Sequence, residues 1–133
     1  MVLFALIFGI IEFAWVIYAG NFMAVAAQQG SRYAMVRGSD WASSCVSVSD
    51  YGCKATAADV QNYILSLAHG GINLQKSDIT VTWLTTTAAG SSCTQYSQGC
   101  QVEVKVSYSF PLHIPFLSTT IPLSSTSIET IQN

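Results

Sequence analysis

Apolar side chains occupy the start of the chain almost without interruption. Between Met1 and Ala27, the residues outside the apolar set are Gly9, Glu12, Gly20 and Asn21. A helix rises 1.5 Å per residue, and about 20 helical residues cross the roughly 30 Å hydrocarbon core of a bilayer. The pattern therefore predicts a helix long enough to span a membrane.

A cleaved secretory signal is the alternative interpretation of this run, and three features oppose it. No basic residue precedes the run, and the run is longer than the apolar core of a signal peptide. Ala27 also continues into Gln28 and Gln29 without a turn signal. We therefore interpret the run as a helix that the protein keeps.

Small residues follow at helical spacing. Ala26, Gly30, Ala34 and Gly38 recur every four residues, and Ala5 and Gly9 repeat this spacing nearer the start. Such a stripe lets another backbone approach the helix closely. The breaker-rich stretch after Arg37 ends the pattern, so we expect a helix over residues 1–38. Its length of about 57 Å exceeds the width of a small domain, so half of it is expected to project.

Residues 39–133 are expected to form a small globular head. Thr56 followed by Asp59 is typical of a capped helix start, and Val60, Ile64 and Leu67 then share one helical face. Gly70 and Gly71 are expected to end this second helix.

Alternating apolar and polar positions predict the strands. The alternation covers residues 79–83 and, more strongly, residues 102–110. Pro111, Pro115 and Pro122 then indicate a turn-rich segment, and residues 123–131 can supply a last strand. The predicted fold class is α+β: a long N-terminal hydrophobic helix, then a head with one helix and an antiparallel sheet of about three strands.

The composition narrows the class of protein. The 133 residues are 50% hydrophobic and only 9% charged, with a net charge of −2. Typical soluble domains are about a quarter charged, so this chain is neither disordered nor an ordinary soluble enzyme. Its five basic residues are scattered, which argues against nucleic acid as a partner.

The four cysteines form two local pairs, Cys45 with Cys53 and Cys93 with Cys100. Neither spacing fits a structural zinc site, and both pairs lie in segments rich in Ser and Gly. Among the three possible connectivities we favour the two local disulfides, which place the head outside the reducing cytosol. Four reduced thiols are the alternative.

Candidate catalytic groups are sparse. His69 falls at the end of the second predicted helix, where it meets the helix dipole, and His113 lies in a proline-flanked segment. The sequence contains no short-spaced carboxylate pair, glycine-rich phosphate loop or nucleophile elbow. We therefore expect no enzymatic activity, no cofactor and no bound metal.

Both ends of the chain resemble one family. Phe4-Ala-Leu-Ile-Phe-Gly-Ile-Ile-Glu-Phe13, Tyr18 and Ala26-Ala-Gln-Gln-Gly-Ser-Arg-Tyr-Ala34 look like the N-terminal signature of TadE-like proteins, pilin-like components of tight-adherence (Tad/Flp) pili. Val102-Glu-Val-Lys-Val-Ser-Tyr-Ser-Phe-Pro111, Pro115-Phe-Leu and Ile121-Pro-Leu-Ser-Ser125 are similar to the closing segment of this family. The resemblance implies a pilin-like protein with one membrane helix, matured by a prepilin-type peptidase and used in a surface filament or its assembly.

One departure concerns the start of the chain. Such proteins usually carry further residues, with a processing site and an early acidic residue, ahead of the run that begins here at Phe4. We therefore assign no peptidase site, and Met1 is a native, a processed or an incomplete terminus.

Glu12 has two interpretations, because a lone acid in an apolar helix is costly unless it is neutral or paired. In a filament it could pair with the N-terminal amine of a neighbouring subunit, or with a hydroxyl such as that of Tyr18, and fix the axial register. Alternatively, it is a protonated or headgroup-facing acid without a pairing role.

Three functions are compatible with these features. The first is a structural pilin that is anchored in the inner membrane before assembly and then forms an extracellular helical homopolymer for adhesion, with the pilus assembly machinery as a further partner. The second is a minor TadE-like assembly or tip component, and the third is a monomeric membrane-anchored head that binds a partner. The small-residue stripe and Glu12 favour helix association and therefore the first two.

Overall fold

The computed structural model describes the chain except for residues 1, 39–53, 70, 115–116 and 133. The elements are helix α1 (Val2–Val36), helix α3 (Ala57–Leu67), the 3-10 turn η1 (Lys76–Asp78) and strands β1 (Ile79–Thr87), β2 (Cys100–Ile114) and β3 (Leu117–Thr130). A long apolar helix, one short helix and a three-stranded antiparallel sheet confirm the predicted α+β class.

Helix α3 begins as its sequence predicts. Asp59 donates its backbone N–H to Oγ1 of Thr56 over 3.3 Å, and Oδ2 of Asp59 accepts the Thr56 backbone N–H over 2.9 Å. This reciprocal capping satisfies two backbone donors at the helix start. The helix ends at Leu67, ahead of the predicted glycine stop, because Ala68 already has extended backbone.

The sheet has β2 in the centre, with an antiparallel neighbour on each side. Strand β1 pairs with β2 from Ile79↔Val106 to Thr87↔Cys100. Strand β3 pairs with β2 over a longer distance, up to Ile114↔Leu117. The β2–β3 hairpin is therefore much longer than β1.

The predicted turn-rich segment is wrong at Pro111 and Pro122, where the strands continue. Pro111 lies inside β2 and Pro122 lies inside β3, whereas Pro115 is outside the described residues. The pairs Pro111↔Thr120 and Ser109↔Pro122 fall at equivalent points of the alternating hydrogen-bond pattern. Each proline can therefore turn its nitrogen away from the partner strand, toward an open edge, where a missing N–H costs little.

The core lies between the C-terminal half of α1, the inner face of the sheet and α3. Val102, Val104 and Val106 of β2 are fully buried, as are Val60 and Ile64 of α3. Helix α1 contributes mainly small side chains to this core, namely Ala19, Met23, Ala26, Ala27 and Ala34. Small residues on α1 let the β-branched side chains of the sheet approach closely, which fills the interior.

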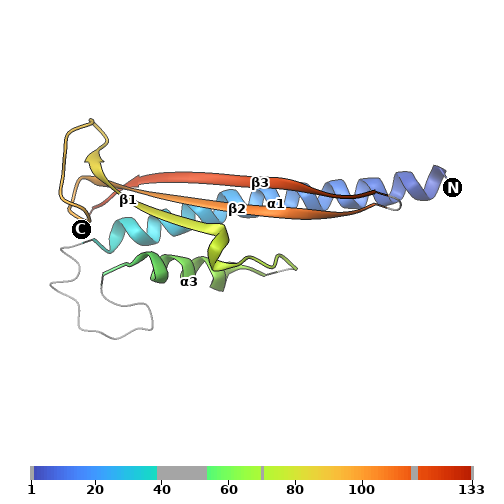
Figure 1. The fold of residues 1–133 in the computed structure, drawn as a ribbon, viewed down its shortest axis with the longest axis horizontal. Coiled ribbons are helices and arrows are strands. Elements are labelled where there is room, and N and C mark those ends of the chain that lie inside the picture. Colours follow the sequence, from blue (N-terminus) through green and yellow to red (C-terminus); the bar gives the residue numbers. More distant parts are fainter. Residues whose placement is uncertain (1, 39–53, 70, 115–116, 133) are drawn as a thin grey trace.

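Helix α1 does not project from the head over half of its length. Figure 1 shows β2 and β3 running beside α1 toward its N-terminal end. The side chains of residues 3–11 are all exposed, and Glu12 is the first half-buried one. The expectation of a half-projecting helix failed because the hairpin continues past its prolines and covers more of α1 than a short sheet could.

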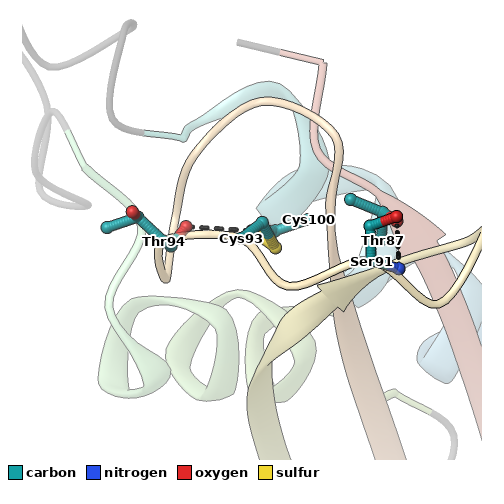
Figure 2. Close-up of a disulfide and its surroundings, with 5 residues drawn as sticks. All are labelled: Thr87, Ser91, Cys93, Thr94 and Cys100. Carbon is teal, nitrogen blue, oxygen red and sulfur yellow. Dashed lines mark hydrogen bonds between the residues drawn. A yellow bond between two sulfur atoms is a disulfide. The ribbon is translucent and has the colours of Figure 1, made fainter.

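A disulfide closes the loop between β1 and β2 (Figure 2). It joins Cys93 to Cys100, with 5.9 Å between the two Cα atoms. Cys100 is fully buried at the start of β2, so the disulfide fixes the loop to the core. The predicted pair Cys45 and Cys53 lies outside the described residues.

The same loop places an aromatic cluster over β1. The ring of Tyr96 lies 4.5 Å from that of Trp83, and Nζ of Lys54 lies 3.8 Å from the centre of the Tyr96 ring. Tyr96 has a backbone φ of 70°, which residues other than glycine rarely adopt. Disulfide and stacking together hold this residue in place.

Candidate functional site

The largest exposed apolar surface that the structure describes lies on α1. We call it the apolar face; its large exposed side chains are Leu3, Phe4, Leu6, Ile7, Phe8, Ile10, Ile11, Phe13, Trp15, Ile17, Tyr18 and Val25. By length and composition, α1 is apolar enough to cross a membrane. Only 6% of its most apolar window is buried, so this window is not a core helix of a soluble domain. A continuous apolar surface of this kind marks a contact with lipid or protein.

The N-terminal half of α1 is the more apolar half, yet most of its side chains are exposed, and full burial begins only in the C-terminal half. From Leu3 to Tyr18, Glu12 and Val16 are half-buried and the other residues are exposed. From Ala19 onward, one side of the helix is buried against the head. The head therefore covers one stripe of α1 and leaves the apolar face uncovered.

A shallow hollow interrupts the apolar face. It has a volume of about 430 Å³ and is lined by Ile11, Ala14, Trp15 and Tyr18, which lie on one stripe of the helix. The Trp15 and Tyr18 rings meet edge to face at 5.8 Å between their centres. The small Ala14 side chain leaves the space between these larger groups. The hollow can receive a large apolar side chain from a second helix.

Glu12 lies on the covered stripe, at its N-terminal limit. Val16, Ala19 and Met23 follow it at spacings of four, three and four residues; Val16 is half-buried like Glu12, whereas Ala19 and Met23 are fully buried. Tyr18 stands six positions from Glu12, which places the two side chains about 120° apart around the helix. They lie on different faces of α1, so pairing between Glu12 and Tyr18 remains a hypothesis about two different subunits.

The small-residue stripe divides into two parts. Ala26, Gly30 and Ala34 are buried against the head of the same chain, whereas Gly38, which the prediction placed in the helix, is buried beyond the end of α1 at Val36. A Cβ atom added to Gly30 would lie 2.5 Å from Cδ1 of Ile64 and 3.2 Å from Cγ1 of Val104. In this subunit, the close approach that the stripe permits is therefore made by α3 and β2.

Ala5 and Gly9, the other part of the stripe, are exposed. A Cβ atom added to Gly9 meets none of the described atoms within 4 Å. These two residues, together with the hollow, are the part of the predicted packing surface that is open to a second helix.

The sequence analysis did not predict two contacts between α1 and the head, one polar and one aromatic. Ser31 is fully buried, and its Oγ lies 2.8 Å from Oγ of Ser127 in β3. The Tyr33 ring stacks on Tyr63 of α3 at 4.6 Å, and Arg37 donates to the Tyr33 hydroxyl over 2.6 Å. The one available signal was that Ser31 directly follows Gly30, at the closest packing position.

The similarity to known proteins lies in α1. Residues 1–32 match the family of TadE-like proteins. This match confirms the resemblance at the N-terminal end, and it covers the apolar face together with the first part of the stripe that packs on the head. No curated protein and no solved structure matches the chain.

The TadE-like match indicates a general class of function for comparison. The family is related to the Tad pilus and is not an enzyme family. Together with the apolar helix, the match fits a membrane-anchored component related to this pilus. The C-terminal resemblance lies beyond the matched residues and stays a prediction.

Proposed function

We propose that this chain is a structural subunit of a Tad-type pilus. Helix α1 anchors the subunit in the inner membrane before assembly and then packs against α1 of other copies in an extracellular filament used for adhesion. The pilus assembly machinery transfers the subunit between these two environments. The observation that supports the proposal is the apolar face, which the head leaves uncovered on a helix that matches TadE-like proteins.

The hydrophobic effect explains how the apolar face can serve both in the membrane and in the filament. Lipid and neighbouring helices each keep the apolar face out of water, and burying one large side chain stabilises by roughly 1.5–3 kcal/mol. The hollow around Ala14 lies on a different part of the subunit from the exposed Ala5 and Gly9. When one surface contacts a different surface on the next copy, repetition produces an open helical filament.

Two variants of matched exposure test this proposal. Trp15 in the apolar face is 45% exposed, and Ile128 on β3 is 47% exposed. Trp15→Ala removes one wall of the hollow, and we expect about a tenfold loss of filament yield from a loss of roughly 1.5 kcal/mol per contact. Ile128→Ala removes a similar apolar area from the head and is expected to leave the yield unchanged.

The yield of filaments sheared from cells, at equal cellular subunit level, gives the result. Equal yields from the two variants would contradict assembly through the apolar face. A subunit that is rare in filaments of normal yield would instead favour the minor assembly or tip component.

A further inference from the structure

The far end of the β2–β3 hairpin differs from its base. We call residues 107–112 of β2 with residues 119–124 of β3 the distal ribbon. Among the described residues, β1 pairs with β2 only as far as Val106, so the distal ribbon contains two strands where the base contains three. Two strands alone are marginally stable in water and need a surface to pack on.

The burial of β2 changes at the same point. Val102, Val104 and Val106 are fully buried, whereas Tyr108 and Phe110, on the same face of the strand, are half-buried. These two side chains and Leu123 of β3 pack on the edge of the core. The outer face is polar or rich in proline, with Ser109, Pro111, Thr120, Pro122 and Ser124 exposed. The distal ribbon therefore rests on the molecule through a thin apolar contact.

The position of the distal ribbon along α1 follows from two close contacts at the hairpin base. Gly30 lies against Val104, and Ser31 bonds Ser127, which is the β3 partner of Val104. From Val104 to Leu112 the strand advances about 26 Å, at about 3.3 Å per residue. The same distance covers about 18 residues of helix, which ends near Glu12. The half-burial of Glu12 and Val16 agrees with this placement, as does Figure 1.

This placement conflicts with a membrane-spanning α1. Residues 3–22 of α1 are about as long as a membrane span, and Gly9, Glu12, Gly20 and Asn21 are the residues in this stretch that fall outside the apolar set. The distal ribbon lies beside the same part of α1, so its Ser, Thr and Pro face and its open strand edges would enter the hydrocarbon. Unpaired backbone groups at such an edge cost several kcal/mol each in lipid, which is why open sheets do not occur there.

We propose that the distal ribbon is a hinged cover for α1. It separates from the helix when α1 spans the membrane and packs on residues 12–22 of α1 when the helix leaves the lipid. The hinge lies just beyond the pair Val106↔Ser125, at the level where β1 begins with Ile79 and beyond which it does not pair with β2. The hairpin base stays in place, because the Ser31–Ser127 contact and the packing at Gly30 hold it. The inference rests on the membrane anchor of the proposed function.

Electron–electron distance measurements between two nitroxide labels test the hinge in lipid nanodiscs. The distal pair is Ala14→Cys with Thr120→Cys, and the proximal control pair is Gln28→Cys with Thr126→Cys; all four positions are exposed. By the same rise per residue, each pair joins α1 to the strand at the same level, so a docked hairpin gives short distances for both. The chain without added cysteines, treated with the same label, gives the background.

We expect the proximal distance to stay short and the distal distance to exceed it by more than about 15 Å, since six strand residues are about 20 Å long. A short distal distance in chains that have inserted would overturn the hinge and leave the membrane anchor intact. Long distances for both pairs would also overturn it, because the whole head would then separate from α1. Failure of the chain to insert would instead contradict the anchor, and with it the proposed function.

Discussion

At the scale of single residues, Gly30 shows how closely α1 packs on its own head. The nearest atoms to an added Cβ belong to Ile64 and Val104, and both of these side chains are fully buried. Gly9 has the same residue type on the same helix but faces open space. Replacing each glycine by alanine therefore measures two different effects: at Gly30 a steric clash with the head, and at Gly9 the higher helix propensity of alanine alone.

We predict that Gly30→Ala destabilises the protein and that Gly9→Ala does not. Gly30→Ala pushes Ile64 and Val104 apart and should lower the free energy of unfolding by about 1–3 kcal/mol. Gly9→Ala should leave it unchanged or raise it by up to about 1 kcal/mol, because alanine has the higher helix propensity. Denaturant unfolding of both variants in the same detergent measures the difference. Equal stabilities would show that the packing at Gly30 is looser than described.

At the scale of elements, the loop between β1 and β2 depends on its disulfide. The bond closes a loop with a sequence separation of 7 and holds Tyr96 against Trp83. For a loop of this length, the entropy of the unfolded chain predicts a contribution of about 2.5 kcal/mol.

The double variant Cys93→Ala, Cys100→Ala should therefore lose about 2–3 kcal/mol of stability and become more accessible at Trp83. Thermal unfolding gives the first result, and quenching of tryptophan fluorescence gives the second. Thr94→Ala, in the same loop, is the control and should change neither. A double variant with normal stability would show that the aromatic cluster holds the loop without the bond.

Local pattern explains which elements the sequence predicts and which it does not. The capped start at Thr56 and the alternation over residues 102–110 are short-range signals, and the structure contains both features. The sequence predicted the strand over residues 123–131 but missed the part of β2 beyond Phe110 and the part of β3 before Leu123. A proline ends a central strand but is tolerated at an edge, and β2 becomes an edge here because β1 begins only at the level of Val106. The hairpin beside α1 was missed because no local signal specifies a contact between residues so far apart in the chain.

The candidate site shows the same limit. Its apolar face follows directly from the composition of residues 3–25, and Glu12 stands out in it as the single charge. The packing partner of the stripe from Ala26 to Gly38 could not be predicted, because the same spacing permits packing on the head of the same chain or on another subunit. Burial assigns this part of the stripe to the own head.

At the scale of the whole molecule, the subunit has one end that is stable in water and one that is not. The head has a buried core, a polar outer sheet face and a disulfide, whereas residues 3–11 expose apolar side chains. An isolated subunit is therefore expected to need lipid, detergent or other copies to remain dispersed.

A charge introduced at Phe8 should impair membrane insertion, whereas the same charge on the head should not. Phe8→Lys places an ammonium group inside the predicted span, which costs about 2.5–3.5 kcal/mol on insertion scales, and should lower the membrane-bound fraction severalfold. Ile128→Lys adds the same charge to the exposed face of β3 and should leave that fraction unchanged. Alkaline extraction of membranes followed by immunoblotting measures both. Normal retention of Phe8→Lys would contradict a span through this segment.

The proposed function requires that many copies of this chain build a filament through α1. Electron microscopy of material sheared from cells, with mass spectrometry of the same preparation, tests it most directly. We predict helical filaments in which this chain is the dominant protein, with α1 in the interior and the disulfide-closed head outside. Filaments in which the chain is rare, or a chain found in membranes alone, would contradict assembly of the filament from this chain.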